Sequence, residues 1–112
     1  MSKFEEVIEA CTAQATELGL DLSTELLTKV AKGLGPSIYN ADSSKVSGSD
    51  AEELARVKNN FLINKLGLED SPALDEAIAE VMEKMGSSNR NKLRVNVYAL
   101  LAKKFGKEGI YE

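Results

Sequence analysis

Hydrophobic residues recur at helical spacing through residues 89–105, and they almost encircle the helix that this spacing predicts. The apolar positions are Leu93, Val95, Val97, Tyr98, Ala99, Leu100, Leu101, Ala102 and Phe105. The polar residues are reduced to a narrow stripe, which consists of Lys92, Asn96 and Lys103. Arg94 and Lys104 fall inside the apolar arc. A helix with so little polar surface belongs between other helices, so this segment is predicted to be the centre of the fold.

Four further amphipathic stripes precede this segment, and each lies between a capping residue and a glycine. The expected helices run from Ser2 to Gly19, from Asp21 or Ser23 to Gly33, from Asp50 to Gly67, and from Ser71 to Gly86. Ser87 or Ser88 is the expected cap of the last helix, which Gly106 closes. The pattern therefore predicts about five helices and no sheet.

One long segment at about residues 34–49 separates the second and third stripes. Pro36 excludes a continuing helix, and Ile38, Tyr39 and Val46 are apolar residues that would pin the segment to the core. We expect an ordered loop with one helical turn near Asp42–Lys45. The predicted fold is an all-α, compact single-domain bundle over residues 1–112, with this loop as its irregular part.

Charge is distributed unevenly along the chain, whose formal net charge is −4. The segment Lys84–Lys107 contains basic residues and no Asp or Glu, so the acidic residues all lie outside it. One interpretation is that acidic helices complement the basic one within the fold. The alternative is a basic face that meets an anionic partner.

Composition restricts the chemistry available to this chain. It has no histidine, and its single cysteine, Cys11, shares an apolar stripe with Val7 and Ala15, which predicts a buried and inert thiol. No apolar run is long enough to cross a membrane, and the N-terminus lacks the apolar region of a secretion signal. We therefore expect a cytoplasmic, non-enzymatic protein with no metal, no cofactor and no membrane association.

The best candidate for a binding site is the junction before the last helix. Ser88, Asn89, Arg90 and Lys92 surround the expected helix N-terminus, where unpaired N–H groups attract anions. Capping by Ser88, with Arg90 and Lys92 paired to the fourth helix, would explain the same residues. Arg94 needs a counter-charge, for which Glu80, Glu83 or a bound ligand is expected. The speculative set is Ser88, Asn89, Arg90, Lys92, Arg94, Tyr39 and Asn40.

Three blocks of sequence also carry a resemblance. They are KGLGPSIYN at residues 32–40, VKNNFLINKLGL at 57–68 and GSSNRNK at 86–92, followed by KKFGKE at 103–108. In this order they resemble a small bacterial family that is catalogued only as a domain of unknown function. The resemblance covers nearly the whole chain, least clearly the first helix. It implies a compact bacterial helical protein and supplies no activity or catalytic residue.

Two classes of function are compatible with these observations. The first is a protein-interaction or regulatory module with an unidentified protein partner, using the Pro36–Ser49 segment and the amide-rich helix faces at Asn59, Asn60 and Asn64. The second is a phosphate- or nucleic-acid-binding protein that uses the basic last helix for an anionic ligand. The negative net charge and the few aromatic residues favour the first class.

Overall fold

The first helix follows the predicted apolar spacing. The computed structural model describes residues 3–20, 22–39, 45–46, 50–86 and 92–106. α1 spans Lys3–Glu17, and its expected cap, Ser2, lies outside the described residues. The helix ends as predicted, because Gly19 adopts a φ of 68° and the N–H of Leu20 donates to the carbonyl oxygen of Ala15 at 2.8 Å.

The second helix begins as predicted and ends slightly later. α2 spans Thr24–Leu34, and the side chain of Ser23 accepts a hydrogen bond from the N–H of Leu26 at 3.1 Å. Gly33 was the predicted stop, but it remains within the helix. Gly35 ends the helix instead, with a φ of 70°. Glycine adopts a positive φ without steric cost, so either glycine was able to end the helix, and Gly35 does.

The predicted loop over residues 34–49 is more regular than expected in its first part. A 3₁₀-helix, η1, spans Gly35–Tyr39 and follows α2 directly, with Ile38 buried. The helical turn expected near Asp42–Lys45 is not found at its last residue, because Lys45 forms an antiparallel bridge with Leu93. Residues 42–44 lie outside the described part of the chain.

The third predicted helix divides into two kinds of helix. α3 spans Ala51–Arg56 and begins at the predicted cap, where Asp50 accepts hydrogen bonds from two N–H groups of the first turn at 3.0 and 3.4 Å. A π-helix, η2, then spans Val57–Ile63. The sequence predicted a single α-helix up to Gly67. The wider π turn orients one group of apolar side chains inward, and its buried members are Val57, Phe61 and Leu62.

The fourth helix agrees closely with its pattern. α4 spans Pro72–Lys84, with proline at the first helical position as predicted. Ser71 is the N-cap residue, although its side chain makes no capping hydrogen bond. Gly86 follows the helix with a φ of 98°. The buried face of α4 consists of Leu74, Ala77, Ile78, Val81 and Met82.

The last helix is shorter than predicted. α5 spans Arg94–Lys104, and its N-cap residue is Leu93, so a start at Ser87 or Ser88 was wrong. The two described residues directly before α5, Lys92 and Leu93, pair with a distant segment, and the backbone of Leu93 is extended. Beside the Lys45–Leu93 bridge, the N–H of Val46 donates to the carbonyl oxygen of Lys92 at 2.8 Å.

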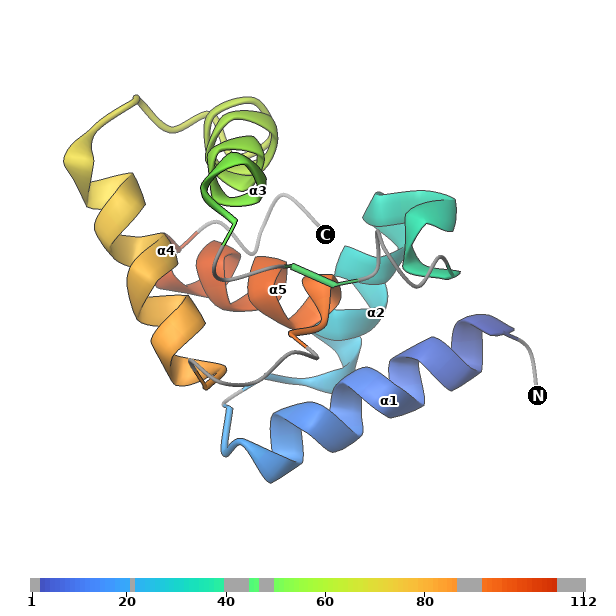
Figure 1. Cartoon of the computed structure of the whole chain (residues 1–112). Coiled ribbons are helices and arrows are strands. Elements are labelled where there is room, and N and C mark those ends of the chain that lie inside the picture. Colours follow the sequence, from blue (N-terminus) through green and yellow to red (C-terminus); the bar gives the residue numbers. More distant parts are fainter. Residues whose placement is uncertain (1–2, 21, 40–44, 47–49, 87–91, 107–112) are drawn as a thin grey trace.

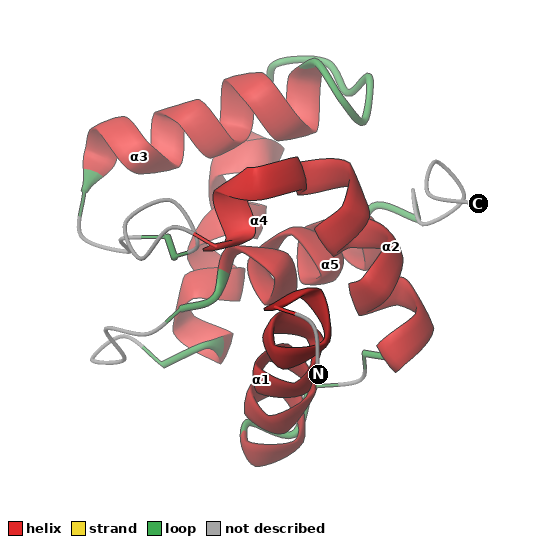
Figure 2. Ribbon diagram, turned by 90° about the vertical axis from the view of Figure 1, so that its right-hand side faces the viewer, coloured by secondary structure: helices red, strands yellow, loops and turns green. Residues whose placement is uncertain are grey.

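α5 is the centre of the molecule, as its apolar circumference predicted. Figure 1 shows it in the middle, with α1, α2 and α4 around it, and all three contact it. Figure 2 shows the same arrangement from the side, with α3 at one end. Every residue from Val95 to Ala102 is buried. The radius of gyration is 12.9 Å, close to the value of about 13 Å for a compact domain of this length. The predicted all-α fold is therefore confirmed.

Two of the three residues in the polar stripe expected on the last helix, Lys92 and Asn96, are buried, whereas Lys103 is partly exposed. Asn96 has no exposed surface, and Lys92 is only 3% exposed. The amide Nδ2 of Asn96 donates to the carbonyl oxygen of Cys11 at 3.1 Å and to Oε1 of Gln14 at 2.9 Å. The same Gln14 oxygen accepts a hydrogen bond from the N–H of Leu93 at 3.3 Å. These polar groups attach α5 to α1, because a buried amide needs internal partners.

Candidate functional site

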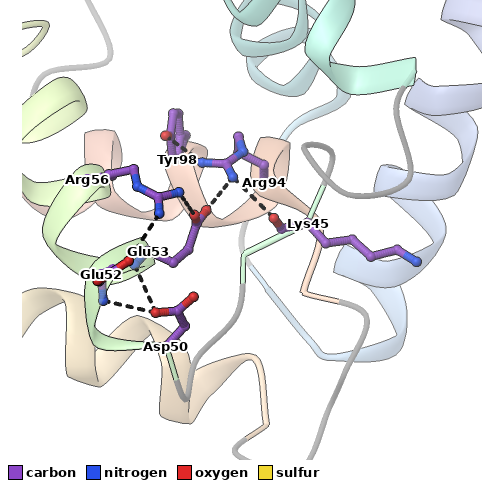
Figure 3. A network of polar contacts seen from close by, with 7 residues as sticks. All are labelled: Lys45, Asp50, Glu52, Glu53, Arg56, Arg94 and Tyr98. Atoms are coloured by element: carbon purple, nitrogen blue, oxygen red, sulfur yellow. Dashed lines mark hydrogen bonds and ion pairs between the residues drawn. The ribbon is translucent and has the colours of Figure 1, made fainter.

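Arg94, at the first turn of α5, is the hub of a polar network (Figure 3). Its Nη1 donates to the hydroxyl of Tyr98 at 2.9 Å, and its Nη2 donates to the carbonyl oxygen of Lys45 at 3.2 Å. Nη2 also forms an ion pair with Glu53. The side chains of Arg94 and Glu53 are 14% and 13% exposed, so the pair is largely removed from water. The side chain of Lys45 points away from the network.

The acidic partner of Arg94 comes from α3, which corrects the prediction of Glu80 or Glu83 on α4. Glu53 lies in the first turn of α3, and Arg56 also contacts its carboxylate, at 3.1 Å. Glu80 and Glu83 were predicted because their helix is the acidic helix nearest to Arg94 in the sequence, and nearness in sequence does not decide which helices are in contact. The first turn of α5 instead faces α3 and the Lys45–Val46 segment.

The network is continued by an aromatic contact. The rings of Tyr98 and Phe61 stack with their centroids 4.1 Å apart and an interplanar angle of 20°. The phenol is thus positioned by η2 on one side while its oxygen accepts a hydrogen bond from Arg94. The counter-charge of Arg94 is supplied within the chain, which favours a structural role over a role in ligand binding.

Only part of the predicted anion site lies within the described residues. Ser88, Asn89 and Arg90 lie outside the described residues, as does Asn40. Lys92 is described, but it precedes α5 and is almost fully buried. The first helical residue is Arg94, whose positive charge would oppose the helix dipole if Glu53 did not compensate it.

Tyr39, the remaining member of the predicted set, is at the end of η1. It is 46% exposed and is the exposed large hydrophobic residue among those described. The contacts described for this part of the chain do not bring it together with Lys92 or Arg94. The described contacts thus do not join the three described members of the set, and the predicted binding site stays a prediction.

A groove between α4 and α5 is a feature that the sequence analysis did not identify. It has a volume of about 330 Å³, near the lower end of the range of about 300–1,000 Å³ for ligand sites. It is lined by Glu80, Val81 and Lys84 from α4 and by Leu100, Lys103 and Lys104 from α5. Lys104 forms an ion pair with Glu80 across it. We call this feature the α4–α5 groove.

The residues that line the α4–α5 groove have helical spacing in the sequence. On α4, Glu80 and Lys84 are four residues apart and Val81 lies between them in sequence, so the three side chains share one helix face. On α5, Leu100, Lys103 and Lys104 share a face in the same way. The lysines were recognised as part of the basic segment. Their association with Glu80 depends on how α4 packs against α5, and that packing is not encoded in local spacing.

Cys11 is buried as predicted, with 1% exposure. Burial raises the pKa of its thiol from 9.0 to about 11. Among the described residues, no group of three or more His, Cys, Asp or Glu side chains is arranged to hold a metal ion. None of the helices in the described ranges is long and apolar enough to span a membrane.

The burial of Cys11 predicts slow chemistry at its sulfur. A pKa raised by about two units leaves about 100-fold less thiolate at pH 8, and the thiolate is the reactive form. We expect a thiol reagent to label the native protein at least about 100-fold more slowly than the urea-unfolded protein. The rates are compared by absorbance with a chromogenic disulfide. Labelling of the native protein at a rate within tenfold of the unfolded rate would contradict the prediction.

Comparison with known proteins agrees with the resemblance noted in the sequence. A family model described as "Protein of unknown function (DUF2853)" matches residues 11–109. The match begins inside α1 and extends beyond α5, so it includes the α4–α5 groove and the Arg94 network. No curated protein matches the chain. Because the family model covers most of its length, the chain belongs to the DUF2853 family of proteins of unknown function.

Proposed function

We propose that the protein is a non-enzymatic interaction module that binds a segment of a partner protein in the α4–α5 groove. The observation that carries this proposal is the composition of the groove. Two largely buried apolar residues, Val81 and Leu100, lie between three lysines and a single glutamate. A concave apolar base with a few charged groups around it is typical of a recognition site.

The available side chains favour binding over catalysis. The chain has no histidine, and its single thiol is held in the protonated form by burial. Glu53, a carboxylate that is mostly withdrawn from water, is engaged by two arginines. A general base must reach a substrate, and a carboxylate held in this way is poorly suited to that task.

The alternative of phosphate or nucleic-acid binding by the last helix receives less support. Arg94 is paired with Glu53, Lys104 is paired with Glu80, and Lys92 is almost fully buried. Internal counter-charges of this kind reduce the attraction for phosphates, which dominates nucleic-acid affinity. Two basic residues of the Lys84–Lys107 segment, Arg94 and Lys104, thus have an acidic partner from another helix.

Further contacts with the partner, a bacterial source and a cytoplasmic location remain predictions. Tyr39 and the exposed amides of Asn59, Asn60 and Asn64 would serve as additional contacts with a partner. A bacterial source follows from the resemblance, and a cytoplasmic location accords with a single buried cysteine.

The proposal is tested by reversing charge in the groove. We expect Lys84→Glu combined with Lys103→Glu to reduce the capture of a specific partner protein by at least about fivefold, because two attractive contacts become repulsive. Affinity capture from an extract of the source cells, quantified by mass spectrometry, provides the measurement. The matched control combines Lys3→Glu and Lys32→Glu, two exposed positions on α1 and α2 with the same change in net charge.

Circular dichroism establishes that both double variants are folded. Equal capture by wild type, groove variant and control would contradict the proposal. If the groove variant instead loses nuclease-sensitive nucleic acid, the phosphate-binding alternative is correct and the protein-binding proposal is wrong.

A further inference from the structure

The ion pair between Glu80 and Lys104 crosses the α4–α5 groove and is accessible to water. The side chain of Lys104 is 40% exposed and that of Glu80 is 64% exposed. Ion pairs that remain in contact with solvent contribute little net stability, because water and salt compete with each partner. This pair is therefore suited to exchange, unlike the withdrawn pair between Arg94 and Glu53.

The charge of the groove is opposite in sign to that of the whole protein. Three lysines and one glutamate line it, whereas the formal net charge of the chain is −4. An approaching acidic segment would be attracted locally by the lysines and would find Val81 and Leu100 beneath them. A basic segment would meet three like charges and would be rejected.

Resting on the proposed function, we infer that the groove selects an acidic protein segment with a central apolar side chain, and that Glu80 is an internal competitor for it. In the free protein the carboxylate of Glu80 occupies the ammonium group of Lys104. A ligand carboxylate competes with Glu80 for the N–H donors of Lys104 and is repelled by the negative charge of Glu80. A segment without a carboxylate cannot replace the ion pair between Glu80 and Lys104. Glu80 therefore increases the selectivity of the groove for acidic segments, while it lowers the affinity for each of them.

The inference predicts that loss of a charge strengthens binding. We expect Glu80→Gln to lower the Kd for a short fluorescein-labelled peptide of glutamates around a central leucine by about threefold, because Lys104 is released and one repulsive charge is removed. Lys104→Gln should raise the Kd. Fluorescence anisotropy with the full-length protein measures both effects.

The matched control is Glu25→Gln. Glu25 forms an exposed i, i+4 ion pair with Lys29 on α2, at 3.1 Å, so this variant has the same charge change and loses a comparable pair away from the groove. We expect its Kd to equal that of wild type. A peptide with lysines in place of the glutamates should not bind any of the variants.

The outcomes separate this inference from the proposed function. Suppose that the Lys84→Glu, Lys103→Glu double variant no longer captures the cellular partner, but Glu80→Gln and Glu25→Gln bind the acidic peptide equally. Then Glu80 does not compete with the ligand, while the proposed role of the groove in binding a partner protein is supported. If the partner is lost but the acidic peptide does not bind at all, the assigned ligand class is wrong. Equal or tighter binding of a single-stranded oligonucleotide would also overturn that assignment. Tighter peptide binding by Glu80→Gln alone supports the inference.

Discussion

Arg94→Glu should lower the free energy of unfolding by about 3–5 kcal/mol, the range for breaking an ion pair that is largely withdrawn from water. The substitution removes the partner of Glu53 and places a second carboxylate beside it. It also removes the hydrogen bonds to Tyr98 and to the carbonyl oxygen of Lys45. Urea unfolding followed by circular dichroism measures the loss.

Two further variants define what Arg94 contributes. Arg94→Leu should be milder, because Arg56 still contacts the carboxylate of Glu53 at 3.1 Å after the loss of Arg94. Lys32→Glu, a reversal at an exposed position in the last turn of α2, should change stability by no more than about 1 kcal/mol, the size of a helix-dipole effect. If Arg94→Glu is as stable as wild type, the network in Figure 3 does not hold α3 to α5.

Asn96→Asp should destabilise the protein by about 4 kcal/mol at pH 7, although it changes the size of the side chain very little. The amide of Asn96 donates to two oxygen atoms, one from Cys11 and one from Gln14, and a carboxylate cannot donate to either. The Oδ1 atom of Asn96 is buried without a hydrogen-bond partner among the described residues, so a charge there would be unsolvated. Burial that raises the pKa of the introduced carboxyl group by about three units, at about 1.36 kcal/mol per unit, corresponds to the expected loss of about 4 kcal/mol.

The penalty of Asn96→Asp should depend on pH in a defined direction. Burial raises the pKa of the introduced carboxyl group in the folded state well above its value of about 3.9 in the unfolded chain. The folded state then binds the extra proton, so stability relative to wild type is highest below about pH 4 and falls as pH rises to about 7. Urea midpoints of both proteins across this range measure the effect.

An exposed asparagine supplies the control for this experiment. Asn60→Asp makes the same chemical change on the surface of η2, and we expect a change within about 0.5 kcal/mol. A pH-independent difference between Asn96→Asp and wild type would show that the introduced carboxyl group is solvated, contrary to its placement between α1 and α5.

Local sequence patterns determined most of the helical architecture. The apolar stripe and proline of α4, the Ser23 and Asp50 caps, and the left-handed Gly19 all lie where the sequence placed them. The central position of α5 also followed from its apolar circumference. These features depend on residues within about one helical turn of each other, so they are readable without knowledge of the fold.

Two local predictions failed where a longer-range contact was stronger than the local preference. α5 begins at Arg94 rather than near Ser88, because the residues just before it pair with Lys45 and Val46 in extended form. The α-helix expected up to Gly67 continues after Arg56 as η2, and Phe61 of η2 stacks on Tyr98. Neither competing contact is visible in a window of one or two turns.

The sequence alone predicts the approximate positions of the main helices, the apolar face of each, and the need of Arg94 for a counter-charge from a carboxylate or a bound ligand. The packing of the helices, by contrast, makes Glu53, 41 residues away, the partner of Arg94, and it places the amide of Asn96 against the carbonyl oxygen of Cys11, 85 residues away. It also brings Glu80 to Lys104 at the α4–α5 groove. The reason is physical: periodicity and capping arise within one helix, whereas the partner of a charged side chain depends on which helices pack together, a choice made by the burial of apolar surface over the whole chain.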